Sequence, residues 1–156
     1  TLHASRPAGV ETEVFVYGRL PLAFSARCFT ARHYDLNKDD CQFKCLDHAE
    51  GLTLKTREGQ DFLCINGIQT MSAQSYNLLH EIPDILRMGI DIVRISPQKQ
   101  HMAAIIAAFD AARRGEPVDV DSGAWNASGQ VDGYWFGDAG IRQHHTQALA
   151  HQGANA

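Results

Sequence analysis

The order of secondary structure predicts an α/β fold. An alternating segment rich in β-branched and aromatic residues over residues 10–18 (VETEVFVYG) predicts a strand, and the apolar residues 90–95 (IDIVRI) predict a second, buried strand. Apolar residues at helical spacing between Ser96-Pro97 and Gly115 predict a helix that packs on the sheet. Strand, loop, helix, strand and helix in this order are typical of parallel strands joined by helical crossovers.

The remaining segments are shorter or less regular. Residues 52–55 and 60–65 flank a turn that contains glycine, and they predict a β-hairpin. Residues 68–79 show no clear period, and we expect a loop and a short helical turn there. Pro83 suits the first turn of a helix over residues 83–88.

Composition places the chain among globular proteins. It has 156 residues, 44% hydrophobic and 21% charged, so it can bury a core as one domain. A formal net charge of -4 without a basic stripe argues against a nucleic-acid partner. No apolar run approaches the roughly 20 residues that span a bilayer, so we expect no transmembrane segment. Residues 141–156 are rich in Gln, His and Ala, and we expect a frayed tail.

The cysteines divide into two groups by their surroundings. Cys28, Cys41 and Cys45 lie in a polar segment with the spacing Cys-x12-Cys-x3-Cys. Cys64 lies in the apolar run of residues 62–65 (FLCI), where we expect a buried structural side chain. The sequence therefore predicts three candidate metal ligands and one core cysteine.

Spacing alone leaves the metal undecided. Several thiolates together are typical of iron–sulfur and zinc centres. His48, three residues after Cys45, is a candidate fourth ligand for zinc. A third interpretation is that the three cysteines share a loop without a metal.

Several blocks resemble one known family. Residues 14–32 (VFVYGRLPLAFSARCFTAR), 66–71 (NGIQTM) and 91–98 (DIVRISPQ) are similar to UbiV-like ubiquinone-biosynthesis members of the collagenase-like peptidase family, and Gly133-Tyr134-Trp135 also fits this subgroup. The family signature begins E-x-F-x-x-G and has a cysteine ten residues after the Gly; its positions are filled here by Glu13, Phe15, Gly18 and Cys28.

The resemblance implies an iron–sulfur protein. Such members hold a [4Fe–4S] cluster on four cysteines, three of them spaced like Cys28, Cys41 and Cys45. The fourth family ligand lies outside this chain. With a UbiU-like iron–sulfur partner and a lipid-carrier accessory protein, these members hydroxylate the ubiquinone ring precursor without oxygen in the cytoplasm. The chain would then be a subunit of an O2-independent ring hydroxylase.

The resemblance also implies a fold. The family fold is a (β/α)8 TIM-barrel-like domain, which needs about 250 residues to close. We therefore expect residues 1–140 to form its C-terminal half, with a cysteine-bearing insertion and the β-hairpin. In such barrels chemistry gathers at the C-terminal ends of strands, and the cysteine segment follows the strand of residues 10–18 as that rule requires.

Other candidate residues have a structural alternative. Arg94 lies in an apolar strand, where it either points toward an anionic substrate or pairs with Asp91 or Glu13. Glu13 is itself a weak substrate-site candidate. Asn66 is a candidate for lining the site, but Asn-Gly equally indicates a tight turn.

Two rival functions remain open. One is a zinc-stabilised binding module that uses Cys28, Cys41, Cys45 and His48. The other is a peptidase, which only the family name suggests. The sequence shows no HExxH motif and no readable Ser/His/Asp or Cys/His arrangement, so we expect no active peptidase.

Overall fold

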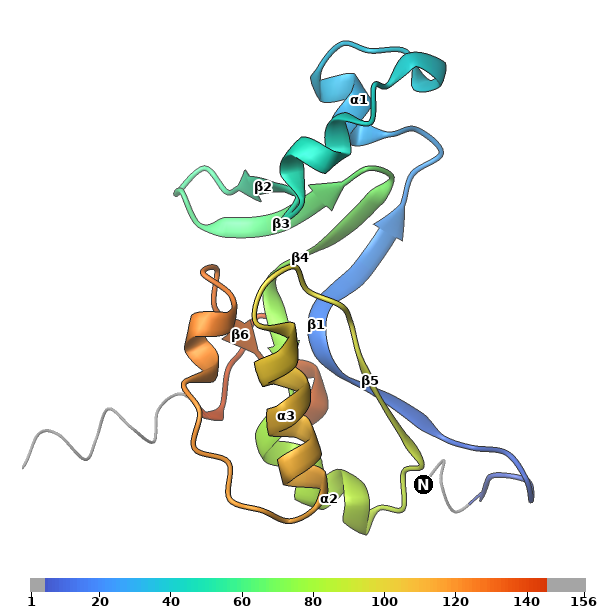
Figure 1. The fold of residues 1–156 in the computed structure, drawn as a ribbon, viewed down its shortest axis with the longest axis vertical. Coiled ribbons are helices and arrows are strands. Elements are labelled where there is room, and N and C mark those ends of the chain that lie inside the picture. The colour runs from blue at the N-terminus through green and yellow to red at the C-terminus, as the bar shows by residue number, and fades with distance from the viewer. Residues whose placement is uncertain (1–4, 146–156) are drawn as a thin grey trace, which may run out of the picture. The chain divides into compact units, whose positions relative to one another are not determined.

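The computed structural model describes residues 5–145, drawn in Figure 1. The described chain forms two compact units: unit 1 contains residues 5–18 and 76–145, and unit 2 contains residues 19–75. Within residues 5–145, no helix combines the length and the apolar character that a membrane crossing requires.

Strands β1 (Glu13–Phe24) and β4 (Gln69–Asn77) run through both units. They are antiparallel neighbours. In unit 1 the Leu78 N–H donates to the Val16 carbonyl at 2.9 Å, and in unit 2 the Ser25 N–H donates to the Ile68 carbonyl at 2.8 Å. Each unit is therefore built around one part of this strand pair.

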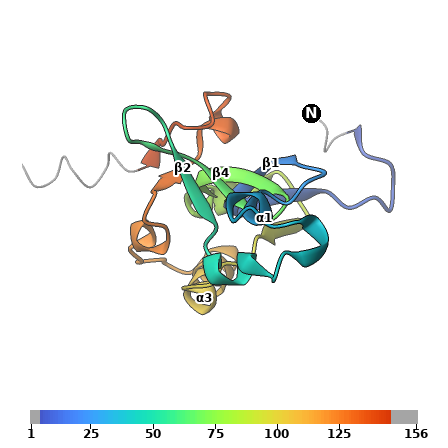
Figure 2. The same cartoon turned by 90° about the horizontal axis from the view of Figure 1, so that it is seen from above.

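Unit 1 pairs the first part of β1 with a parallel strand, β5 (Ile92–Ile95), while β6 (Gln130–Val131) pairs with β4. Helices α2 (Ile82–Arg87) and α3 (Met102–Arg113) contribute buried side chains to its core. Figure 1 shows both helices, and Figure 2 shows α3 along its axis. Short 3-10 helices are η4 (Leu79–Glu81), η5 (Ser122–Trp125) and η6 (Gly133–Phe136). The fully buried apolar side chains are Val16, Tyr17, Leu78, Ile82, Ile85 and Ile105.

Unit 2 contains the predicted hairpin. Strands β2 (Leu52–Lys55) and β3 (Asp61–Asn66) are antiparallel, and β3 continues into β4 through a second tight turn. The cysteine segment carries α1 (Phe29–His33) and the 3-10 helices η2 (Lys38–Asp40) and η3 (Lys44–His48). The hydrogen-bonded order in this unit is β2-β3-β4-β1.

The α/β class agrees with the structure, and the sheet is mixed. The strands predicted over residues 10–18 and 90–95 pair in parallel as β1 and β5, and the predicted hairpin is antiparallel. Only the β1–β5 pair is parallel among the pairs given above; the hairpins are antiparallel because their connections are too short for a crossover. Whether residues 1–140 form half of a barrel stays a prediction.

The loop expected over residues 68–79 is also wrong, because residues 69–77 form β4. Residues 69–77 are largely polar, yet they form a strand in which the Ser72 hydroxyl has hydrogen-bond partners. Ser72 Oγ accepts the Leu20 N–H at 2.8 Å and donates to the Gln74 carbonyl at 2.6 Å. A satisfied hydroxyl does not oppose strand formation, so hydrophobic alternation failed as a guide here.

Helix α3 begins later than Ser96-Pro97 suggested. The Ser96 N–H donates to the Tyr17 carbonyl at 2.8 Å, which keeps this residue with the strands. The helix starts at Met102, after His101 takes a left-handed backbone with φ of 59°. Ser96 and Pro97 therefore lie between β5 and α3 and do not cap the helix.

The core of unit 2 encloses the Cys64 thiol. Cys64 is fully buried, as expected; its Sγ accepts from Arg19 Nη1 at 2.7 Å and donates to the Glu50 carbonyl at 3.1 Å. Burial raises the pKa of the Cys64 thiol, so it stays protonated at neutral pH. Gly51 packs on this thiol: a Cβ there would lie 2.4 Å from Sγ.

Residues 141–145 differ from the expected frayed tail. The Asp132 and Gly133 N–H groups both donate to the Arg142 carbonyl, at 2.9 and 3.0 Å. A Cβ on Gly133 would lie 2.0 Å from the Ala139 carbonyl oxygen, so only glycine permits this approach. The rest of the expected tail, residues 146–156, lies outside the described residues.

His144 fixes this segment by charge. Its Nδ1 lies 2.8 Å from Asp132 Oδ1, and its Nε2 lies 2.9 Å from Asp138 Oδ2. These contacts raise the pKa of His144, with Asp132 as the largest cause. A neutral imidazole has one N–H and is able to donate to only one of the two carboxylates.

We expect Gly51→Ala to destabilise the protein more than Gly59→Ala, by about 2 kcal/mol. Both glycines have a positive φ, +79° and +85°, but a Cβ meets nothing within 4 Å at Gly59. The matched pair therefore separates the clash with Cys64 from backbone strain. Urea unfolding measures the difference, and a double variant Gly51→Ala, Cys64→Ala should recover part of the loss. Equal destabilisation by both glycine variants would contradict the packing described for Cys64.

We expect the stability contributed by His144 to be fully present below its ordinary pKa of 6.5 and to be lost as the pH rises through its raised folded-state pKa. Asp132→Asn should lower the pKa of His144, and Asp138→Asn should lower it less. Proton NMR titration of the His144 ring measures both shifts. A His144 pKa that neither variant changes would mean that the two carboxylates do not hold the imidazolium.

Candidate functional site

The cysteine segment begins where β1 ends. Cys28 is the N-cap of α1, and its Sγ accepts the Ala31 N–H at 3.4 Å. The thiol thus satisfies one of the N–H groups that a helix start leaves without a partner. This contact places Cys28 at a defined position, half-buried, at the first turn of α1.

Cys41 and Cys45 follow on the next two short helices. Cys41 is the C-cap of η2, and Cys45 lies within η3. Between them Gln42 and Phe43 have φ values of 52° and 50°, in the left-handed region. Both thiols are free and half-buried, so each remains accessible for ligation.

A Tyr–His contact joins the ends of this segment. Tyr34, the C-cap of α1, has its Oη 2.5 Å from Nε2 of His48 at the end of η3, and the two rings stack at 5.7 Å. Lys44 Nζ lies 5.8 Å from the Tyr34 ring centroid. The helix that Cys28 begins is therefore tied to the helix that carries Cys45.

The same contact bears on the zinc alternative. A ring nitrogen that ligates zinc gives its lone pair to the metal, and His48 already uses Nε2 toward Tyr34. Only Nδ1 of His48 remains for a metal in this arrangement.

The thiols suit a soft metal centre, but they are not assembled as one. Among residues 5–145, no three His, Cys, Asp or Glu side chains lie together as a metal site. Cys28, Cys41 and Cys45 nevertheless share one segment of unit 2 with free thiols. The donor chemistry fits an iron–sulfur or zinc centre, and a bound centre would have to draw these thiols together.

Asn66 lies in the same unit, at a turn that contacts the start of α1. The Phe29 N–H donates to the Gly67 carbonyl at 2.7 Å, and the Gly67 N–H donates to Thr30 Oγ1 at 3.1 Å. Asn66 closes β3 and pairs with Gln69 across the turn. The tight-turn interpretation therefore describes its backbone, and the turn supports the helix that Cys28 caps.

Arg94 and Glu13 lie in unit 1, where they pair with each other. Arg94 Nη2 lies 2.5 Å from Glu13 Oε1, and the Arg94 side chain is 62% exposed. Asp91 has other partners: it accepts the Thr12 N–H at 2.8 Å and pairs with Arg6. Of the two pairings considered for Arg94, the one with Glu13 is present.

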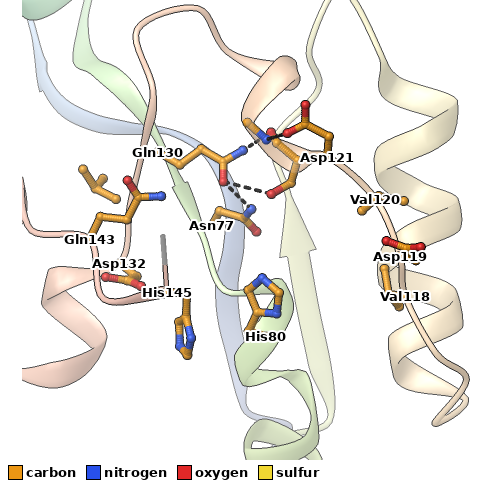
Figure 3. Close-up of a pocket in the computed structure, with 13 residues that line it drawn as sticks. Asn77, His80, Val118, Asp119, Val120, Asp121, Gln130, Asp132, Gln143 and His145 are labelled. Atoms are coloured by element: carbon orange, nitrogen blue, oxygen red, sulfur yellow. Dashed lines mark hydrogen bonds between the residues drawn. The ribbon is translucent and has the colours of Figure 1, made fainter. Parts of the chain in front are cut away.

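Unit 1 also contains a polar pocket of about 400 Å³, shown in Figure 3. Its buried polar side chains are Asn77, Gln130 and Asp132, and Asn77 Nδ2 donates to Gln130 Oε1 at 2.8 Å. Figure 3 shows Val118 and Val120 on one side of this floor and Gln143 and His145 on the other. The complete lining is Asn77, His80, Val118, Asp119, Val120, Asp121, Ser122, Gly123, Gln130, Val131, Asp132, Gln143 and His145.

Sequence reasoning missed this pocket because its contacts span long stretches of chain. Glu81 accepts the Trp135 indole N–H at 2.9 Å and lies 2.6 Å from His145 Nε2. These partners are 54 and 64 residues away. The Gly133-Tyr134-Trp135 block was a sequence signal for this region, because Gly133 bonds to Arg142 and Trp135 bonds to Glu81.

Comparison with known proteins identifies the family. The model of peptidase family U32 matches residues 2–115. The tRNA hydroxylation protein P1 of Bacillus subtilis (strain 168) is 25% identical over 114 residues, which cover 64% of this chain and 25% of that protein. The chain thus spans about a quarter of the length of this relative. No solved structure matches it. Because the family model covers more than half of the sequence, the chain belongs to peptidase family U32.

Proposed function

We propose that this chain is part of an iron–sulfur protein of oxygen-independent hydroxylation, in which Cys28, Cys41 and Cys45 are three ligands of a [4Fe–4S] cluster. One observation carries the proposal. Three half-exposed free thiols share the segment after β1, while the fourth thiol is buried in the core. The family relative named for hydroxylation supports the reaction class.

The donor set favours iron–sulfur over zinc. A fourth cysteine from outside this chain would complete an all-thiolate shell, the usual set for a [4Fe–4S] centre. The zinc module instead needs Nδ1 of His48 as its fourth ligand, because Nε2 of His48 contacts Tyr34. When bound, the cluster would supply one-electron redox chemistry, and the chain's own contribution is to hold the thiols at the start of α1, at the end of η2 and within η3.

The substrate we propose is the ubiquinone ring precursor, with a UbiU-like iron–sulfur protein as partner and a lipid-carrier accessory protein, in the cytoplasm. The sequence blocks that resemble the ubiquinone-biosynthesis subgroup support this choice. In this assembly the chain acts as a subunit of a ring hydroxylase. Glu13, Arg94 and Asn66 remain weaker candidates for the substrate side.

A second candidate substrate is RNA, because the Bacillus relative is named for tRNA hydroxylation. Charge argues against it. The chain carries 14 Lys and Arg against 18 Asp and Glu, with a net charge of -4, whereas RNA binding depends on basic surfaces.

We expect Cys28→Ala, Cys41→Ala and Cys45→Ala each to lower bound iron and sulfide in the complete protein to less than half of the wild-type content, because each removes one thiolate. Cys64→Ala is the matched control: it should keep the iron and cost stability on the order of 1 kcal/mol. Iron, sulfide and zinc per chain are measured after anaerobic purification. Loss of iron in Cys64→Ala as complete as in Cys28→Ala would contradict the ligand assignment, and zinc that His48→Ala releases would establish the zinc module.

We expect loss of the Cys28 ligand to abolish ring hydroxylation in cells grown without oxygen, while aerobic quinone synthesis is unchanged. The measurement is the quinone content of cells that carry Cys28→Ala or Cys64→Ala as their only copy. Hydroxylated nucleosides in total tRNA are measured in the same cells. Normal anaerobic quinone with loss of tRNA hydroxylation would transfer the assignment to the RNA reaction.

A further inference from the structure

The pocket of unit 1 has the size and lining of a small-molecule site. Its volume of about 400 Å³ lies within the range of roughly 300–1,000 Å³ typical of ligand pockets. Val118, Val120 and Val131 give it apolar walls, and the amides of Asn77 and Gln130 give it a buried polar floor. All lining residues belong to unit 1, so the pocket does not involve the cysteine segment.

One wall carries an imidazole held by a buried carboxylate. Glu81 is 8% exposed, and its two oxygens meet two different groups: Oε2 accepts the Trp135 indole N–H, and Oε1 lies 2.6 Å from His145 Nε2. The ring nitrogen that faces a carboxylate carries the proton, so the neutral His145 ring keeps its lone pair on Nδ1. A carboxylate that fixes the tautomer of a histidine in this way is the arrangement that orients a general base.

His144, the residue before His145, differs from it in its hydrogen bonding. His144 meets a carboxylate at each ring nitrogen, Asp132 and Asp138, so both of its ring nitrogens already have partners. Asp132 is 2% exposed at the pocket floor and is paired by this contact. Of these two adjacent residues, only His145 keeps a ring nitrogen for a ligand hydroxyl.

We propose that this pocket binds an uncharged small molecule with an apolar body and a hydroxyl group, and that His145 is its hydrogen-bond acceptor. The valines suit the apolar body. Asp119 and Asp121 at the lining disfavour an anion, and the one deeply buried carboxylate is already paired.

Phenol, toluene and benzoate are the probes of this site, since they share a ring and differ in the hydroxyl and the charge. NMR of the protein with labelled histidine follows each titration. We expect phenol to bind about tenfold more tightly than toluene, which corresponds to one hydrogen bond, and benzoate to bind most weakly. His145→Gln should reduce phenol affinity to that of toluene, and His33→Gln, on α1 in unit 2, should leave it unchanged.

Glu81→Gln tests the orienting role of the carboxylate. We expect the ring nitrogen shifts of His145 to change from a single Nε2–H form to a mixture of tautomers, with a several-fold loss of phenol affinity and no loss for toluene. Equal affinities for phenol and toluene, benzoate binding as tight as phenol, or a proton on Nδ1 in the wild type would each overturn the proposal. No iron enters these measurements, so they are independent of the cluster.

Discussion

Burial of the Cys64 thiol against Arg19 and the Glu50 carbonyl is the constraint on which unit 2 depends. The thiol packs against Gly51, and its burial removes it from solvent, while the other three thiols are half-buried in the segment after β1. A buried thiol with a raised pKa is a poor ligand, since a metal binds the thiolate. Core packing thereby makes Cys64 a structural cysteine and leaves Cys28, Cys41 and Cys45 as the candidate ligands.

Much of the fold could be predicted from the sequence, because buried strand faces and turns produce local sequence patterns. Alternating residues predicted β1, and a turn with glycine predicted the hairpin. Pro83 predicted the first turn of α2. Strand β4 lacks such a sequence pattern, because Ser72 is held by hydrogen bonds to backbone groups and not by apolar contacts. Those partners lie on another strand or two residues along, and no single-strand pattern records them.

The two candidate sites differ in the same way: one has a local sequence pattern, and the other depends on contacts between distant residues. Cysteine spacing is local, so Cys28, Cys41 and Cys45 stand out in the sequence, although spacing does not say how a metal would draw them together. The pocket is non-local: Glu81, Trp135 and His145 meet only after the chain has folded. From the sequence, His144 and His145 were expected in a frayed tail. In the structure, Gly133 packs closely on Ala139 and donates to the Arg142 carbonyl, which holds this segment in place.

The central proposal is that the half-buried thiols of Cys28, Cys41 and Cys45 ligate an iron–sulfur cluster. X-ray absorption at the iron and zinc edges of the anaerobically purified complete protein tests it most directly, because it reports the element and its neighbours together. The account predicts iron with sulfur as its nearest neighbours and a second shell of iron, and no bound zinc. Zinc with three sulfurs and one nitrogen would contradict it.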